Sequence, residues 1–143
     1  KRDHEMDGVD YYFLDPTLFN HIKEEDAFIE TTEYAGHSYG SRADTIEPYM
    51  VAILNPRGIN DFHRTRPGQD FIVYVTASKD TRKYRMLKRN DNLNVIWTRL
   101  DSDDVTFAKD QFDHIDLELP NDTGLLETVA DQVHAAYQAF LKE

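Results

Sequence analysis

Two short and almost wholly apolar runs, residues 49–54 and 71–76, constrain the fold of this 143-residue chain more than any other feature. Apolar runs of about four to eight residues are typical of strands buried on both faces of a parallel sheet. Parallel strands need long crossover connections, which are usually helices, and helix signals follow both runs. The alternation predicts an α/β fold in which helices flank a parallel sheet.

Weaker signals predict the other elements. Short strands are expected at residues 9–14, 28–34, 37–40 and 114–119. Helices are expected at residues 16–25, 42–47, 58–63, 79–89 and 125–141, with a further helix that begins at Val95 or Ser102 and ends near Phe112. Asp15 and Ser78 are favourable N-cap residues, and Pro16 suits the first position of a helix.

Composition excludes several classes of protein. The net charge of −11 and the pI near 4.9 argue against a nucleic acid or an anionic membrane surface as a partner. The chain has no cysteine, which excludes disulfides, thiolate metal sites and cysteine nucleophiles. Its apolar runs are far shorter than the ~20 residues that span a bilayer, and its six histidines lack metal-site spacing. We therefore expect a cytoplasmic protein that binds no nucleic acid and no membrane.

The opening segment carries a spaced pattern of charged and aromatic residues. The pattern, Arg-x-x-Glu-x-x-Gly-x-Asp-Tyr-x-Phe, falls on Arg2, Glu5, Gly8, Asp10, Tyr11 and Phe13. Arginine meets a phosphate dianion with two parallel hydrogen bonds, and tyrosine hydroxyls add donors without adding charge. The segment resembles the phosphate-binding motif of the guanylate kinase family. The residues that this resemblance assigns to the phosphate of GMP are Arg2, Glu5, Tyr11 and Tyr39. Taken alone, Tyr11 is better explained as a strand aromatic that packs on the core.

The same resemblance assigns the guanine base to the predicted hairpin. Glu30 stands in the place of the glutamate that binds guanine, and Ser41 in the place of the residue that donates to the O6 atom. A carboxylate accepts from the N1–H and the 2-amino group together, and adenine lacks this pair of donors. Gly40 is expected to let the backbone approach the ligand closely. Without the resemblance, Glu30 is equally an exposed glutamate on a strand edge.

The chain departs from the family pattern at the end of the run at 49–54. Guanylate kinases carry Asp-x-Asp there, whereas this chain has Ile53-Leu54-Asn55. The resemblance makes Asn55 a third candidate for guanine binding, because an amide both donates and accepts. Asn55 brings no charge to position a metal ion or a lysine, so the change affects phosphoryl transfer more than GMP binding.

Arginines flank a predicted mobile lid at residues 90–111. The family places arginines there so that closure brings positive charge to the transferring phosphoryl group. Arg89 and Arg99 are the catalytic candidates. The alternative, which we favour for Arg82, is a solvated helix face whose arginines pair with Asp91, Asp101 and Asp103. Asn121 resembles the asparagine that lies near the adenine ring of ATP.

The GxxxxGK[ST] phosphate loop of P-loop kinases does not occur in the sequence. We expect the first strand, the phosphate loop and the first helix of a P-loop kinase fold, roughly 30 residues, to precede Lys1. The chain is then one guanylate-kinase-like domain with a small mixed-sheet insertion that binds GMP. The expected parts are the insertion at residues 1–48, the core at 49–89 and 112–143, and the lid at 90–111.

The resemblance implies phosphoryl transfer from ATP to GMP, giving ADP and GDP, with Mg²⁺ bound together with ATP in the intact protein. This chain alone is expected to bind GMP, to hold no metal ion and to transfer nothing. The alternative from another class of protein is a non-catalytic guanylate-kinase-like module that binds GMP or a phosphorylated protein partner. The retained Glu30 and Ser41 favour the kinase, since neither serves to grip a phosphopeptide.

Overall fold

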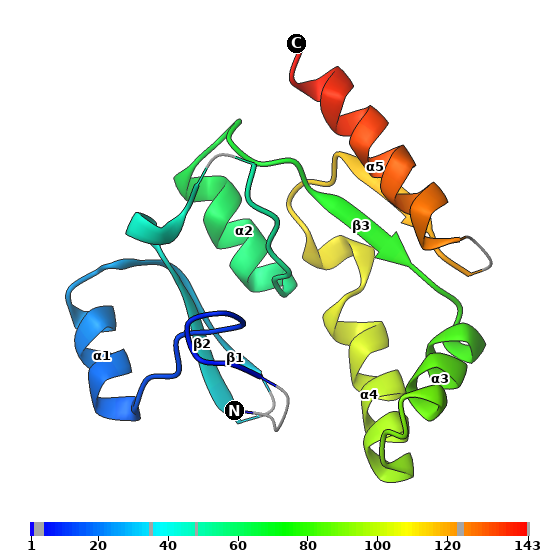
Figure 1. Cartoon of the computed structure of the whole chain (residues 1–143), viewed down its shortest axis with the longest axis horizontal. Helices are drawn as coiled ribbons and strands as arrows, with labels where there is room; N and C mark the ends of the chain where they lie inside the picture. The colour runs from blue at the N-terminus through cyan, green and yellow to red at the C-terminus, as the bar shows by residue number, and fades with distance from the viewer. Residues whose placement is uncertain (2–4, 35, 48, 123–124, 143) are drawn as a thin grey trace. The chain divides into compact units, whose positions relative to one another are not determined.

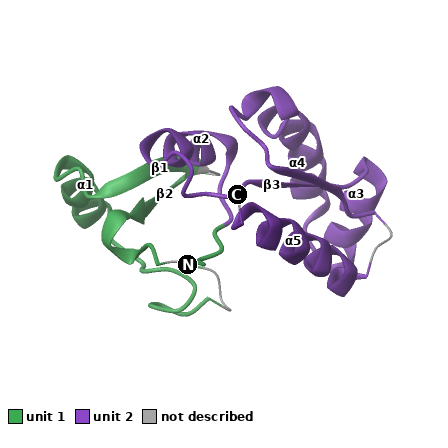
Figure 2. Ribbon diagram, turned by 90° about the horizontal axis from the view of Figure 1, so that it is seen from above, with its two compact units in different colours: residues 1–52 green, residues 53–143 purple. Residues whose placement is uncertain are grey.

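The computed structural model describes residues 1, 5–34, 36–47, 49–122 and 125–142 (Figure 1). The chain forms two compact units, residues 1–52 and residues 53–143 (Figure 2). Five α-helices and four strands lie in the described part of the chain. None of these helices combines the length and the apolar character needed to cross a membrane. The α/β fold class predicted from the sequence is confirmed.

The first unit is a helix followed by a β-hairpin. Helix α1 covers Pro16–Glu24, and the Asp15 side chain caps it by accepting from the backbone N–H groups of Thr17 and Leu18 at 2.9 and 3.0 Å. Strands β1 (Phe28–Tyr34) and β2 (His37–Arg42) pair antiparallel, and a 3₁₀ turn, η1, follows at Ala43–Thr45. The helix and both strands were predicted, while the helix expected at 42–47 is only this short turn.

An irregularity in the hairpin separates two neighbouring side chains. Phe28 pairs with Arg42 and Glu30 with Ser41, so β1 has one more residue than β2 across this interval. Such a bulge reverses the alternation of side chains and directs Phe28 and Glu30 to opposite faces of the hairpin. On its face, the Phe28 ring packs on the Phe19 ring of α1 with 4.9 Å between centroids.

The second unit is built on a parallel pair of strands. Strand β3 (Val73–Thr76) pairs with β4 (Leu117–Pro120) from Val73↔Leu117 to Thr76↔Pro120. The helices of this unit are α2 (Pro56–Thr65), α3 (Lys79–Lys88), α4 (Leu93–Thr106) and α5 (Leu126–Phe140), with a 3₁₀ turn, η2, at Lys109–Gln111. Helices α4 and α5 lie on opposite sides of β3 (Figure 2).

Two apolar clusters hold these layers together. Met86 of α3 packs with Ile96 and Leu100 of α4 in the buried core of the unit. On the α5 side, the Phe71 ring lies 5.6 Å from the Tyr137 ring and 5.2 Å from the Phe140 ring. Helix α4 therefore packs on α3, and α5 packs on the segment that leads into β3.

The strand predicted at residues 49–54 is wrong. The described residues 49–54 form no strand, and the Ile53 side chain is 99% exposed. A parallel strand buries its apolar side chains only between neighbouring strands and the layers on both faces. Apolar composition signals what a segment can bury, and this segment has no strand beside it in the described part of the chain.

The strand predicted at residues 9–14 is also wrong, because two carboxylates fold the segment back on itself. Asp10 accepts from the backbone N–H of Met6 at 2.7 Å, and Asp7 accepts from that of Phe13 at 2.8 Å. Gly8 has a φ of +74°, which a glycine adopts without strain. Side-chain acceptors of this kind compete with a strand ladder for the backbone donors.

Candidate functional site

Glu30 and Ser41 form a buried polar pair on one face of the hairpin. They are directly opposite each other in the register, and the Ser41 Oγ donates to Glu30 Oε1 at 2.7 Å. Glu30 is 4% exposed, so its carboxylate is held in one orientation inside the unit. A charge is rarely buried to this degree unless hydrogen bonds compensate its lost hydration. The predicted juxtaposition of the two residues is therefore present, and Glu30 is not the exposed strand-edge residue of the alternative.

Two tyrosines extend the same face. Tyr39 lies opposite Thr32 in the register, two residues along from Ser41, so its side chain shares the face of Glu30. The ring of Tyr11 meets the ring of Tyr39 edge to face, with 5.9 Å between centroids. This contact brings Tyr11 of the folded segment at residues 6–13 to the hairpin that carries Tyr39, Glu30 and Ser41.

The sequence did not indicate that Asp7 and Asp10 would position Tyr11. Their carboxylates hold backbone N–H groups on either side of it, and the N–H of Gly8 donates to the Tyr11 carbonyl at 2.8 Å. A turn fixed at three points holds Tyr11 against Tyr39 at little further entropic cost. The signal available in the sequence was the Asp-Gly pair at residues 7–8, which is typical of a turn.

The other two phosphate candidates are at the start of the chain. Arg2 lies outside the described residues. Glu5 is described, and its side chain is half-buried. Both stay predictions.

Gly40 has a packing role that the sequence did not reveal. A Cβ atom at this position would lie 2.8 Å from the ring of Phe28 on the opposite face from Glu30. The absence of a side chain lets Phe28 lie across β2 and fill the space toward α1. Gly40 therefore makes room for the Phe28 ring on the face of the hairpin opposite Glu30.

Asn55 lies in the second unit, where it caps α2. Its Oδ1 accepts from the backbone N–H of Gly58 at 2.9 Å, and Pro56 occupies the first helical position. This is the usual use of asparagine before a helix. The cap fixes the rotamer of the side chain and leaves guanine binding by its amide group a prediction.

Of the candidate catalytic arginines, Arg89 directly follows α3 as its C-cap residue and Arg99 lies in α4, and acidic side chains lie near both. Arg89 pairs with Asp91 at 2.5 Å and is 61% exposed at its side chain. Arg99 lies one turn before Asp103, whose pKa burial raises overall, although the charges of Arg99 and Arg82 offset part of that effect. Arg82 is half-buried and pairs with Asp104, an acidic residue that the solvated-face alternative did not name, and Asp104 has a lowered pKa because of that hydrogen bond.

The turn after β4 holds Asn121, the adenine candidate. Arg85 of α3 donates to the Asn121 carbonyl at 2.7 Å and to its Oδ1 at 3.3 Å. The next residue, Asp122, accepts from the backbone N–H of Ser78 at 2.8 Å, and donors from Ser78 and Thr81 lower its pKa to about 2. These contacts join the turn to the start of α3. The contact of Arg85 with a partner 36 residues away was not predictable from spacing.

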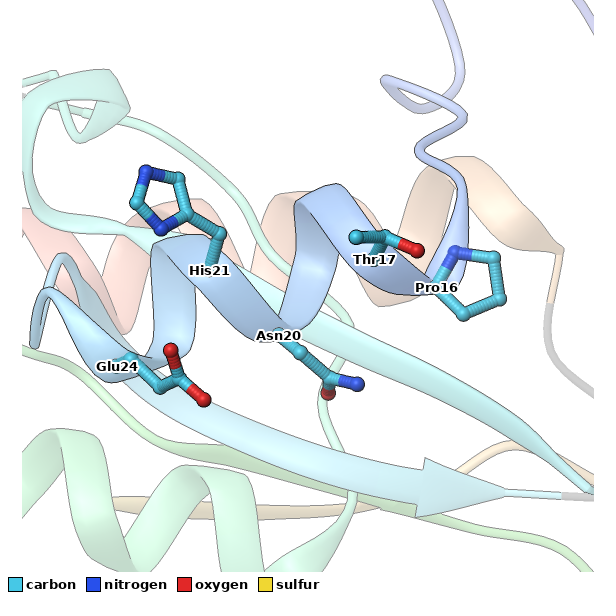
Figure 3. Close-up of a pocket in the computed structure, with 5 residues that line it drawn as sticks. All are labelled: Pro16, Thr17, Asn20, His21 and Glu24. Atoms are coloured by element: carbon cyan, nitrogen blue, oxygen red, sulfur yellow. The ribbon is translucent and has the colours of Figure 1, made fainter.

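Two surface depressions formed by described residues contain neither Glu30 nor Ser41. One lies along α1 and is lined by Pro16, Thr17, Asn20, His21 and Glu24 (Figure 3). The side chains of His21 and Asn20 point away from each other, and all five residues come from a single helix. This depression contains none of the predicted site residues, and we assign it no function.

The residues that the structure describes offer no metal-binding cage. Among them, no three histidine or carboxylate side chains are grouped so that they could hold an ion. Mg²⁺ in nucleotide enzymes is commonly held by one or two carboxylates together with substrate phosphates. A Mg²⁺ ion held in this way takes the nucleotide phosphates as ligands and needs no cage of three protein side chains.

Comparisons with known proteins agree with the geometry. The family model described as "Guanylate kinase" matches residues 1–138. A guanylate kinase from Thermus thermophilus is 32% identical over 104 residues, which cover 68% of this chain and 47% of the relative. A guanylate kinase from Legionella pneumophila strain Paris is 30% identical over 117 residues, which cover 77% of this chain and 54% of the relative. The chain thus spans about half the length of the curated relatives it matches.

Solved structures share the fold. The crystal structure of guanylate kinase from Anaplasma phagocytophilum superposes with a TM-score of 0.74 at 20% identity, covering 97% of this chain and 69% of that one. At 20% identity this likeness shows only that the fold is shared. Membership of the family is shown by the family model and by the relatives at about 30% identity. The chain belongs to the guanylate kinase family.

Proposed function

We propose that the protein is a guanylate kinase, which transfers a phosphoryl group from ATP to GMP, and that residues 1–52 hold GMP. The observation that carries the proposal is the buried Glu30, fixed by Ser41 on the face that also bears Tyr39. A buried carboxylate costs stability unless the folded state or a ligand compensates it. A bound base with two adjacent hydrogen-bond donors would compensate that carboxylate.

Selection of guanine over adenine follows from the same pair. Guanine offers the N1–H and 2-amino donors to Glu30. Its O6 atom accepts from the Ser41 hydroxyl, which has a single donor hydrogen and therefore turns from Glu30 to O6 when guanine binds. Adenine presents an acceptor at N1 and a donor at C6, so it would leave a buried carboxylate facing a lone pair. Buried hydrogen-bonding groups left unmatched account for the strong rejection of such analogues.

The tyrosines and arginines supply the rest of the proposed chemistry. The hydroxyls of Tyr11 and Tyr39 donate to the phosphate of GMP, with Arg2 as its cationic partner. Arg89 and Arg99 bring positive charge to the group in transfer, which is the main demand of an in-line phosphoryl transfer on a protein. Mg²⁺ is expected to arrive with ATP. No step proposed here depends on an ion site in this chain, since the described residues do not form one.

Titration calorimetry with Glu30→Gln tests the proposal. We expect the chain to bind GMP in preference to AMP, and the variant to lose about 100-fold in GMP affinity, because an amide cannot accept from both guanine donors. Glu33→Gln is the matched control, since Glu33 is an exposed glutamate of the same strand on the opposite face. A variant that keeps its melting temperature but loses GMP would support the assignment.

Two results would contradict it. Equal affinity for GMP and AMP would exclude base recognition by Glu30, and failure to bind either nucleotide would favour a guanylate-kinase-like module with another ligand. Transfer itself is tested by following ADP formation from ATP and GMP in the presence of Mg²⁺ with a protein that carries a phosphate loop before residue 1, where ADP is expected only when GMP is present; this chain alone is expected to form none. A cytoplasmic location stays a prediction.

A further inference from the structure

The phosphate side of the proposed GMP site lies among negative charges. Asp7 and Asp10 hold the turn that carries Tyr11, and Glu30 is buried on the hairpin face that also bears Tyr39. Tyrosine hydroxyls donate hydrogen bonds but bring no charge to offset these carboxylates. A phosphate monoester carries a charge of about −2 at neutral pH, so each carboxylate repels it and it needs cations close by.

The described part of the first unit offers three full cations, Lys1, Lys23 and Arg42. Arg42 meets the Asp44 carboxylate with two hydrogen bonds, at 2.9 and 2.6 Å, which neutralise its charge. Lys23 is exposed in the last turn of α1, where a positive charge suits the helix dipole. Lys1, by contrast, lies against the aromatic residues of the phosphate side.

Three aromatic rings connect Lys1 to the hairpin. The Lys1 Nζ lies 5.5 Å from the centroid of the Phe13 ring. The Phe13 ring meets the Tyr11 ring edge to face at 5.9 Å between centroids, and the Tyr11 ring meets that of Tyr39 in the same way, also at 5.9 Å. A positive charge thus lies at one end of this row of rings, and the two candidate phosphate-binding tyrosines follow it.

The contact with Phe13 keeps the ammonium group nearby without fixing it. Asp7 accepts from the backbone N–H of Phe13 at 2.8 Å, so the turn that positions Tyr11 also positions the Phe13 ring. An ammonium ion is attracted to the face of an aromatic ring, but the attraction is weak where the cation is exposed, as Lys1 is. The flexible four-carbon stem of lysine lets the charge move from the ring toward an anion. The Lys1 ammonium can therefore exchange the ring for a stronger partner.

We infer that Lys1 is a phosphate-binding residue of the GMP site. Its ammonium group leaves the Phe13 ring when GMP binds and donates to the phosphate, beside the hydroxyls of Tyr11 and Tyr39. The inference rests on the proposed function and adds a residue that the resemblance does not assign. Lys1 directly precedes Arg2, the proposed cationic partner of the phosphate. Two cations match the charge of the dianion, which one arginine alone does not achieve.

Titration calorimetry of the whole chain with GMP and with guanosine, which lacks the phosphate, tests the inference. We expect Lys1→Gln to weaken GMP binding about tenfold, the lower end of the range for a hydrogen bond to a charged group. Guanosine binding should stay as in the wild type, because Lys1 contacts no part of the nucleoside. Lys1→Arg, which keeps the charge, should recover most of the loss. Lys23→Gln removes the same charge from an exposed position of the same unit and is the matched control, with GMP binding unchanged.

The salt dependence of GMP binding gives a second readout, which needs no measurement on guanosine. Salt screens the attraction between an exposed ammonium group and a phosphate. The GMP affinity of the wild type should therefore fall more steeply with ionic strength than that of Lys1→Gln. The two proteins should melt at the same temperature, since an exposed contact between a cation and a ring adds little to stability.

Three results would overturn the inference. One is unchanged GMP binding in Lys1→Gln. Another is an equal loss of GMP and guanosine, which would indicate a structural role for Lys1. The third is an equal loss in Lys1→Gln and Lys23→Gln, which would indicate an effect of net charge alone. Failure of the proposed function looks different, because the wild type would then bind neither GMP nor guanosine, or Glu30→Gln would keep the preference for GMP over AMP. A wild type that selects GMP through Glu30 but gives one of the three results would keep the proposed function and remove Lys1 from the site.

Discussion

The β1–β2 hairpin and the α3–α4 pair hold their candidate site residues in different ways. In the hairpin, Glu30 is almost fully buried and receives a hydrogen bond from the residue opposite it in the register. In the helix pair, Arg89 is largely exposed and pairs with Asp91, only two residues away. The first arrangement fixes a group before any ligand arrives, whereas the second leaves a charge that can change partners.

The difference fits the two tasks proposed for these regions. Discrimination between bases needs hydrogen-bond acceptors in fixed positions. Burial fixes the Glu30 carboxylate in this way, but burying a charge lowers the stability of the fold unless the charge is compensated. Delivery of charge to a phosphoryl group needs an arginine that can move as a lid closes. An exposed ion pair contributes little to stability, so breaking it during closure costs little as well. We therefore expect substitutions in the hairpin to alter recognition of the base, and substitutions in the α3–α4 pair to alter stability or phosphoryl transfer.

The largest effect is expected for Leu100→Ala, which tests whether the two regions are independent. Leu100 is 1% exposed and packs with Met86 and Ile96 between α3 and α4. Its truncation should lower the free energy of unfolding of residues 53–143 by about 2–5 kcal/mol, as measured by denaturant titration. GMP affinity should change little. Leu93→Ala, at an exposed position of α4, is the control, and a loss of GMP affinity equal to that of Glu30→Gln would abolish the contrast.

Gly40→Ala is expected to act on the hairpin with a smaller effect. The new methyl group would lie 2.8 Å from the Phe28 ring, so the ring or the strand must shift. We expect the unfolding free energy of residues 1–52 to fall by about 1–3 kcal/mol, the usual cost of overpacking. Combining it with Phe28→Leu should recover part of the loss, because the smaller side chain makes room. If the two substitutions instead lower the unfolding free energy additively, the contact with Phe28 is not the cause of the destabilisation by Gly40→Ala.

Ser41→Ala should have a still smaller effect, and one that falls on recognition. The change removes the hydroxyl that donates to Glu30 and that, in the proposed site, turns to the O6 atom of guanine when GMP is bound. We expect GMP affinity to fall by about 1 kcal/mol, or roughly fivefold, the net value of a hydrogen bond of this kind. Ser38→Ala, at an exposed position of the same strand, should bind GMP like the wild type. Equal binding by both variants would remove Ser41 from the site.

Local signals in the sequence predicted the helices well. Capping is a contact between neighbours in sequence, and both Asp15 and Ser78 cap the helices expected after them. The hairpin was predicted from alternation, whereas its register, with Glu30 opposite Ser41, became known only from the structure. The strands at 9–14 and 49–54 failed because a strand depends on a partner, which composition does not report.

The features of the candidate site were likewise only partly predictable from the sequence. Glu30, Ser41, Tyr11 and Tyr39 were identified through a resemblance, and the hairpin brings them together. The bulge that turns Phe28 away from Glu30 was not predictable, because alternation alone directs both to one face. Contacts between distant segments, such as Arg85 with Asn121 or Asn60 with Asp113, required the folded chain.

The smallest expected effect concerns Asp122, and it tests whether exposed charges in the helix region contribute to stability at all. Donors from Ser78 and Thr81 lower the pKa of Asp122 from its usual value of 3.8 to about 2. A lowered pKa in the folded state means that the contribution is present above the unfolded value and is lost as the pH falls toward 2. Asp122→Asn should therefore melt slightly below the wild type at neutral pH, and the two melting temperatures should converge in strong acid. Thr81→Val, which removes one donor, should reduce this pH dependence without abolishing it. A constant difference between wild type and Asp122→Asn at all pH values would mean that the carboxylate acts through packing of the turn, and the helix region would then depend on fixed geometry much as the hairpin does.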